Sequence, residues 1–150
     1  MVAAPPSTEK LWRLLAGVGL EERVRALPNG LETAVTAGGD NLSSGERQLL
    51  CLARAILPYH EAPAGAASAV LICDEVTSSV DGQSDERVLS TLLGLPITIL
   101  YICHRLQHVT HFDLVLVLDQ GQAVELGPPE EMLARADSTL SAMVSAQQGL

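Results

Sequence analysis

Apolar residues recur at helical spacing in the first third of the chain. The pattern predicts three helices, which cover Glu9–Leu20, Glu21–Ala26 and Ser44–Leu57. The third segment is apolar on nearly every side, which is typical of a helix buried all round. Pro58 ends this helix, because proline cannot continue helical hydrogen bonding.

Two short, continuous apolar runs follow, Ala69–Cys73 and Ile97–Cys103. They have the length and composition of strands that are covered on both faces of a sheet. The segment between them, Asp81–Leu93, has helical spacing. This alternation predicts an α/β fold, with a mainly parallel sheet flanked by helices.

The last third of the chain predicts smaller elements. Asp119-Gln120-Gly121 lies between two apolar runs and is typical of a hairpin turn. The expected elements are a short helix at Arg105–His111, hairpin strands at Asp113–Leu118 and Gln122–Leu126, and closing helices at Pro128–Ala134 and Ser138–Ala146.

Composition divides the chain into four parts. Residues 1–10 are rich in Ala and Pro and predict a disordered or truncated edge. Residues 11–57 form the first helical part, and residues 58–68, rich in Ala, Gly and Pro, predict a mobile linker insertion on the surface. Residues 69–150 contain the predicted strands and the closing helices.

Charge and cysteine content exclude several classes of function. The net charge of −9 argues against nucleic acid as a partner, since phosphate neutralisation needs clustered Lys and Arg. No run of about 18 apolar residues is present, so the chain predicts no membrane span. Its start lacks the features of a secretory signal. Cys51, Cys73 and Cys103 lie in apolar runs and predict buried free thiols.

The segment Ser43–Gln48 opens the predicted helix at Ser44–Leu57 and has two interpretations. Ser43 and Glu46 have the spacing of a capping box, which by itself explains both residues. A polar loop that starts a helix also offers backbone N–H groups and a positive dipole end, which suit an anion such as a phosphate. Gly45 keeps this helix start uncovered. Arg47 and Gln48 carry polarity into an otherwise apolar helix.

Two adjacent carboxylates, Asp74 and Glu75, end the first predicted strand. A strand end suits acidic caps, but carboxylates after a buried strand are costly unless a cation or hydrogen bonds compensate them. Because side chains alternate along a strand, Asp74 can face Mg²⁺ while Glu75 faces a water. His104 follows the second strand. The three residues share one edge of the sheet if the strands run parallel.

A metal site is an alternative for the histidines. His104, His108 and His111 fall on one face of a short helix, and Asp113 follows them. A phosphate-cradling loop with the pattern Gly-x-x-x-x-Gly-Lys-Ser/Thr is absent, since the one lysine, Lys10, has no glycine before it. The main phosphate site is therefore expected to lie elsewhere.

Several motifs together resemble the C-terminal portion of an ATP-binding-cassette (ABC) nucleotide-binding domain. The likeness is greatest to the second such domain of the multidrug-resistance-associated (C) subfamily. The motifs occur in the family's order: the signature and its helix at Gly38–Ala55, Walker B at Leu71–Glu75, the D-loop at Ser78–Asp81, the switch-histidine loop at Ile102–Leu106, and a closing hairpin and helix at Val124–Glu131.

The resemblance implies a partial P-loop NTPase fold without its N-terminal Walker A part, and a role for each site residue. Residues 43–46 and Asp81 are expected to bind ATP. Asp74 is expected to hold Mg²⁺, Glu75 to act as the general base, and His104 to reach the γ-phosphate. The residues expected to contact ATP are thus Ser43, Ser44, Gly45, Glu46 and Asp81. Of these, Ser43 and Gly45 are expected to face ATP that is held by the opposing nucleotide-binding domain.

The sequence departs from the strongest family signatures at Ser44 and Glu46. A glutamate beside a triphosphate is electrostatically poor, although it suits a helix start. The departure agrees with the C subfamily, in which one of the two composite sites is commonly degenerate. Without the Walker A strand, Ala69–Cys73 and Ile97–Cys103 are expected to expose apolar flanks.

The function that the resemblance implies is ATP binding and hydrolysis that power transmembrane export. Expected partners are the opposing nucleotide-binding domain and the transmembrane domains of the same transporter. The chain would then lie at the cytoplasmic face of a membrane, which it reaches only through its parent. Alone, it is expected neither to bind ATP tightly nor to hydrolyse it. The alternative is a stand-alone, non-catalytic module that binds a partner ATPase domain.

Overall fold

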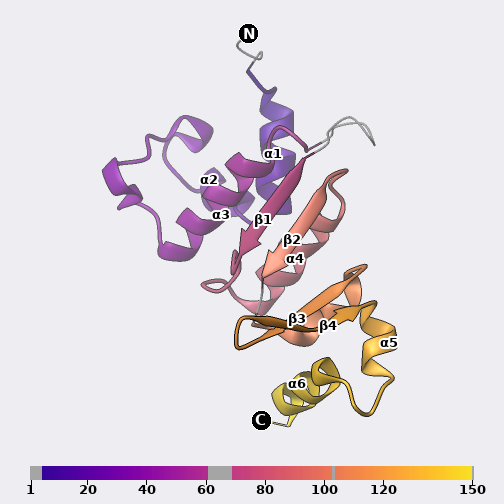
Figure 1. Ribbon diagram of the computed structural model, residues 1–150. Helices are drawn as coiled ribbons and strands as arrows, with labels where there is room; N and C mark the ends of the chain where they lie inside the picture. The colour runs from indigo at the N-terminus through magenta and orange to yellow at the C-terminus, as the bar shows by residue number, and fades with distance from the viewer. Residues whose placement is uncertain (1–4, 61–68, 103, 150) are drawn as a thin grey trace. The chain divides into compact units, whose positions relative to one another are not determined.

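The computed structural model describes residues 5–60, 69–102 and 104–149 (Figure 1). The chain divides into two compact units, Met1–Ile102 and Cys103–Leu150, and each has its own hydrophobic core. Most of the predicted linker insertion and the predicted thiol of Cys103 lie outside the described ranges. No helix within those ranges has the length and apolar character needed to cross a membrane.

The described residues of the first unit form a parallel pair of strands and four α-helices. Strands β1 and β2 pair in parallel, with Asp74 opposite Ile102 at their carboxyl ends. Helix α4 joins the two strands, as the sequence predicts. The elements are α1 (Thr8–Gly17), α2 (Glu21–Arg25), the 3₁₀ turns η1 (Gly30–Glu32) and η2 (Ala37–Gly39), α3 (Ser44–Ile56), β1 (Val70–Asp74), α4 (Gly82–Leu93) and β2 (Thr98–Ile102).

The core of this unit lies between the helices and one face of the β1–β2 pair (Figure 1). Helices α1, α3 and α4 each contribute apolar side chains that are almost fully buried, and β1 adds Cys73. The innermost side chains are Val18, Ile56, Cys73, Val88 and Leu92. Burial of Cys73 confirms the prediction for this thiol and raises its pKa to about 11, because the thiolate is poorly solvated there.

The other face of the β1–β2 pair is exposed. Val70 and Ile72 on β1 are 66% and 64% exposed, and Leu100 and Ile102 on β2 are 51% and 44% exposed. Alternation along each strand places these four side chains on one face. The prediction of strands covered on both faces is therefore wrong for the described residues, whereas the expected apolar exposure is seen.

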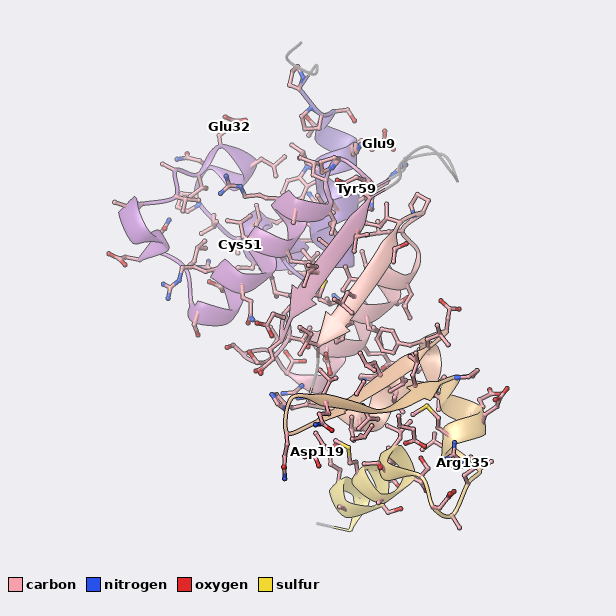
Figure 2. The ribbon with its side chains drawn as sticks, in the orientation of Figure 1. Glu9, Glu32, Cys51, Tyr59, Asp119 and Arg135 are labelled. Atoms are coloured by element: carbon pink, nitrogen blue, oxygen red, sulfur yellow. The ribbon has the colours of Figure 1, made fainter. Side chains whose placement is uncertain are left out.

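Two predictions for the helices also need correction. Helix α1 begins at Thr8, because the Ser7 side chain accepts a hydrogen bond from the Lys10 amide and caps it, so residues 8–10 are not a disordered edge. Helix α3 is not buried all round. Cys51 is exposed on its outer face, so the prediction of a buried thiol there is wrong (Figure 2).

The second unit is built on an antiparallel hairpin. Strands β3 and β4 pair across a turn in which Gln120 and Gly121 have φ angles of 48° and 78°. Two positive φ angles suit the right-handed twist of a two-residue hairpin. Its elements are the 3₁₀ helix η3 (Leu106–His111), β3 (Val115–Asp119), β4 (Gln122–Gly127), α5 (Pro129–Leu133) and α6 (Thr139–Gln148). The α/β class is thus confirmed, but the described strands form two small sheets.

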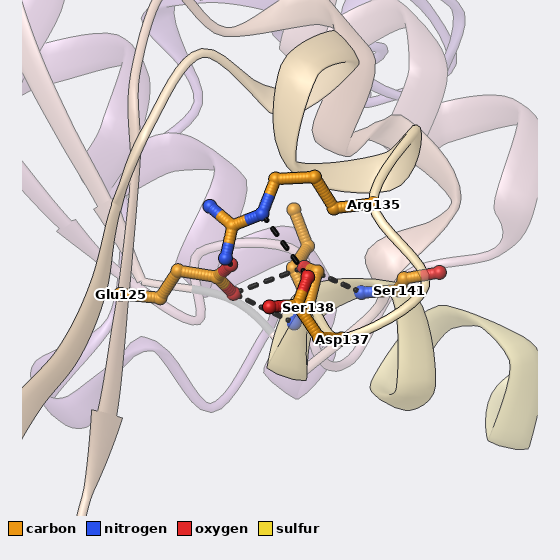
Figure 3. A network of polar contacts seen from close by, with 6 residues as sticks. Glu125, Arg135, Asp137, Ser138 and Ser141 are labelled. Carbon is orange, nitrogen blue, oxygen red and sulfur yellow. Dashed lines mark hydrogen bonds and ion pairs between the residues drawn. The ribbon is translucent and has the colours of Figure 1, made fainter.

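A buried carboxylate links the hairpin to the closing helices in this unit (Figure 3). Glu125 Oε2 on β4 accepts hydrogen bonds from the Ser138 hydroxyl at 3.0 Å and from the Leu140 amide at 3.1 Å. Arg135 Nη2 lies 3.3 Å from Glu125 Oε1, an ion pair without hydrogen-bond geometry. Ser138 Oγ also accepts from the Ser141 amide and caps α6. Glu125 therefore holds the capped first turn of α6 against the hairpin.

We expect Glu125→Ala to lower the free energy of unfolding by about 1–3 kcal/mol, because it leaves the Ser138 hydroxyl and the Leu140 amide without their acceptor. Urea unfolding followed by circular dichroism measures the loss. Asp113→Ala, which removes an exposed carboxylate from the same unit, is the control. Equal stability of the two variants would contradict the role given to Glu125.

Candidate functional site

The start of α3 is a complete capping box. Ser43 Oγ accepts a hydrogen bond from the Glu46 amide at 3.1 Å, and Glu46 Oε2 accepts one from the Ser43 amide at 2.9 Å. These reciprocal bonds satisfy backbone donors that a helix start otherwise leaves open. The capping interpretation of Ser43 and Glu46 is therefore confirmed. Anion binding at the remaining amides stays a prediction.

A basic residue from α2 holds the same glutamate. Arg23 Nε donates to Glu46 Oε1 at 2.8 Å, so both carboxylate oxygens of Glu46 are engaged. The hydrogen bond from the Ser43 amide, followed by the hydrogen bond and charge of Arg23, lowers the pKa of Glu46 below its usual value of 4.5. An internal negative charge thus occupies part of the helix start.

Gly45 brings α3 into direct contact with the loop that follows β1. A Cβ atom at Gly45 would lie 2.8 Å from the Ser79 carbonyl oxygen and 3.5 Å from Val80 Cγ1. Since a Cβ atom essentially never approaches an oxygen that closely, only glycine fits here without a shift of the loop. Gly45 is required for packing within the chain, independently of any ligand.

The two carboxylates at the end of β1 differ in their surroundings. Asp74 is exposed, whereas Glu75 is half-buried and has a φ angle of 47°. The left-handed region costs an L-residue about 1–2 kcal/mol, so a glutamate remains there only when its surroundings hold it. The Glu75 amide donates to the Ile102 carbonyl at 3.0 Å.

Gln48 holds Glu75 from the opposite side. Its Nε2 donates to the Glu75 carbonyl at 2.8 Å and lies 3.5 Å from Ser78 Oγ. The Thr77 hydroxyl is 3.1 Å from the Tyr101 hydroxyl, which ties the same turn to β2. In the sequence, Gln48 stands out as a polar residue in an apolar helix and as part of the signature segment, but not as a contact of Glu75. Nothing in the sequence pattern marks the Thr77–Tyr101 pair.

Asp81 caps helix α4. Its Oδ1 accepts from the amides of Gln83 and Ser84, each at 3.0 Å, and its Oδ2 accepts from the Ser84 hydroxyl at 2.9 Å. The hydrogen bond from the Ser84 amide is the main cause that lowers the pKa of Asp81. The structure gives Asp81 a local capping role. A role toward nucleotide stays a prediction.

The carboxyl ends of β1 and β2 lie side by side, because the two strands are parallel and Asp74 pairs with Ile102. This confirms the predicted parallel pairing. The structure joins the Glu75 backbone to α3 through Gln48, and Asp74 directly precedes Glu75 in the chain. His104 belongs to the second unit, where the Gln147 side-chain amide donates to its carbonyl. Whether His104 joins the carboxylates at one edge stays a prediction.

The alternative metal site at the histidines has little geometric support. Residues 106–111 form a 3₁₀ helix, whose side-chain spacing differs from that of the α-helix in the prediction. The His108 and His111 rings lie 5.9 Å apart. Within the described ranges, no group of three His, Cys, Asp or Glu side chains is arranged to hold a metal ion.

Comparison with known proteins finds relatives among ABC transporters. The chain is 42% identical over 134 residues to the probable multidrug resistance-associated protein lethal(2)03659 of Drosophila melanogaster, covering 88% of this chain and 9% of that protein. It is 41% identical over 134 residues to ATP-binding cassette sub-family C member 2 of Rattus norvegicus, covering 88% of this chain and 8% of that protein. The chain thus spans less than a tenth of these relatives.

A solved structure gives a similar match. A bacterial Atm1-family ABC exporter with ATP bound superposes with a TM-score of 0.78 and 30% sequence identity. The match covers 97% of this chain and 24% of the exporter chain. No protein-family model matches the sequence.

We expect Gly45→Ala to destabilise the protein by about 1–3 kcal/mol, because the added methyl group is forced against the Ser79 carbonyl. Gly82→Ala is a matched control, since a Cβ there meets nothing within 4 Å among the described residues. It should be neutral or stabilising by about 0.5–1 kcal/mol, as alanine favours a helix. Thermal unfolding of both variants compares them. Equal melting temperatures would show that α3 and the loop are not in close contact.

The lowered pKa of Glu46 predicts a pH-dependent contribution to stability. A carboxylate whose folded-state pKa is depressed stabilises the fold above its unfolded pKa of about 4.5, and the contribution is lost as pH falls through the folded pKa. The stability difference between wild type and Glu46→Gln should therefore be largest near neutral pH and shrink below about pH 4.5. Denaturant unfolding across this range measures it, with Glu22→Gln as the charge-matched control. A difference that stays constant with pH would be inconsistent with this cause.

Proposed function

This chain belongs by homology to the ABC transporters of the multidrug-resistance-associated subfamily, and we propose that it forms the C-terminal portion of a nucleotide-binding domain. In this proposal its α/β units are part of a P-loop NTPase fold, and the domain is the second of its transporter. The matches cover only a small share of each relative, which supports a role for this chain as one segment of a larger transporter.

One observation carries the proposal. The first turn of α3 contacts the loop after β1 through Gly45, and Gln48 bonds to the turn at Glu75. A helix start that suits phosphate and a pair of carboxylates thus form one connected group. Phosphoryl transfer depends mainly on the positioning of the reacting groups and on electrostatic stabilisation. A helix start and carboxylates that are held rigidly can provide both.

We assign the roles as follows. Ser43, Ser44 and Gly45 offer the helix start to the γ-phosphate of ATP on an opposing nucleotide-binding domain. Glu46 flanks this contact and already accepts the hydrogen bond of the Ser43 amide, so one donor is closed to phosphate and the completed site is a weak, degenerate one. Asp81, at the start of α4, links the two ATP sites of the dimer.

The carboxylates and the histidine act in the chain's own site. Asp74 is an exposed carboxylate at a strand end, and such a hard oxygen ligand fits Mg²⁺, which would neutralise charge on the phosphates. Glu75 accepts a proton from the attacking water as general base, and His104 stabilises charge at the γ-phosphate. ATP hydrolysis in the complete domain then powers transmembrane export.

The proposed partners follow from the same assignment. They are the opposing nucleotide-binding domain and the transmembrane domains of one transporter, which hold this chain at the cytoplasmic face of a membrane. Residues 11–57 complete the helical subdomain and the signature helix, residues 58–68 form a linker, and residues 69–150 form the C-terminal part of the ATPase core.

An immunoblot with an antibody against the last helix tests whether the chain works as part of a transporter. The proposal expects a band far above 15.8 kDa in the membrane fraction. A band near 15.8 kDa in the supernatant would instead favour the stand-alone module that binds a partner ATPase domain.

In the intact polypeptide, we expect Glu75→Gln to lower ATP hydrolysis by about 100-fold or more, because the amide cannot accept a proton from water. Bound ATP should remain detectable after gel filtration, since binding contacts are kept. Glu86→Gln, an exposed substitution on α4, is the matched control and should retain activity. Undiminished hydrolysis in Glu75→Gln would refute the assignment of the base.

A further inference from the structure

We propose that Gln48 is a positioning residue that holds Glu75 in its left-handed conformation and thereby aims the Glu75 carboxylate. The inference deepens the proposed function and rests on it for the role of Glu75 as general base. Gln48 itself contacts the backbone of Glu75 and does not touch the reacting atoms in this account.

The backbone of Glu75 is hydrogen-bonded on both sides. Its amide donates to the Ile102 carbonyl on β2 at 3.0 Å. Its carbonyl accepts from Gln48 Nε2 at 2.8 Å and from the Ser78 amide at 3.0 Å. A glutamate at a φ angle of 47° needs such constraints, because relaxation to the usual region relieves steric strain. Loss of the Gln48 bond frees the carbonyl on the side of α3.

The chemistry of the Gln48 side chain points the same way. Because the Glu75 carbonyl is an acceptor, the Gln48 amide group must turn its nitrogen toward it. Gln48 Oε1 is then buried, and it has no hydrogen-bond partner within the described part of the chain. An apolar side chain of the same shape would fill this place without an unsatisfied acceptor. The amide is therefore unfavourable for packing alone, and its use is the bond to Glu75.

Helix α3 contacts the loop after β1 at two positions, one helical turn apart. Gly45 contacts the Ser79 carbonyl, and Gln48, about one helical turn later, bonds to the Glu75 carbonyl. The same first turn carries Ser43, which is proposed to face the nucleotide of the opposing domain. Gln48 thus makes the direction of the Glu75 carboxylate depend on the position of the signature helix.

The first test uses the 150-residue chain and amide hydrogen exchange by NMR. Gln48→Met and Gln48→Glu both remove the donor and keep the approximate length of the side chain. We expect the amides of Glu75 and Ser78 to exchange at least tenfold faster in each variant, while the amides of Val88 and Leu92 keep their rates. Gln148→Met, an exposed change in α6, should alter none of these amides. Unchanged exchange at Glu75 and Ser78, or failure of both variants to fold, would overturn the proposal.

The second test measures ATP hydrolysis by the intact polypeptide. A positioning role predicts that kcat falls about tenfold to a hundredfold in Gln48→Met while KM for ATP stays unchanged, because ground-state binding is untouched. A rise in KM with unchanged kcat would contradict positioning of the base. If the wild-type polypeptide hydrolyses no ATP, the proposed function is wrong, whereas the exchange rates still decide whether Gln48 holds Glu75.

Discussion

The close approach of helix α3 to the turn after β1 is the contact on which the candidate site depends. Gly45 permits this approach, because the Cβ of any larger residue would clash with the Ser79 carbonyl. Gln48 adds a hydrogen bond from the helix to the Glu75 carbonyl. The helix start and the acidic strand end are far apart in the sequence but lie in one connected group of the first unit. In our proposal, the Glu75 carboxylate takes its direction from this helix as well as from the strand.

The charge at the helix start is the second constraint. Glu46 closes the capping box and pairs with Arg23, so the chain carries its own anion where a phosphate is expected to approach. The arrangement stabilises the helix and occupies the Ser43 amide, so this donor is not open to a phosphate. In our proposal, this glutamate, which is held by Ser43 and by Arg23 of α2, is the physical reason for a degenerate composite site.

Local signals in the sequence were sufficient for most of the fold. Helical spacing, the cap at Ser43, and the Gln120-Gly121 turn correctly predict α3 and the hairpin, because these features depend on neighbouring residues. The predictions that β1 is covered on both faces and that Cys51 is buried are wrong, since apolar runs do not report which face has a neighbour. The hydrogen bond from Gln48 to Glu75 and the φ angle of Glu75 cannot be predicted from sequence patterns, because both arise from contacts between distant segments of the chain. His104 follows a correctly predicted parallel pair of strands, and its approach to the carboxylates is a prediction that sequence spacing alone supports.

Hydrogen exchange of the intact polypeptide with and without Mg²⁺ and ATP tests the central claim most directly. The Glu75→Gln background would retain the nucleotide during the measurement. If α3 and the turn after β1 form one nucleotide-responsive group, the amides of residues 43–48 and of residues 75–81 gain protection together when ATP is added. Unchanged exchange in both segments would contradict the claim that this chain contributes to an ATP site.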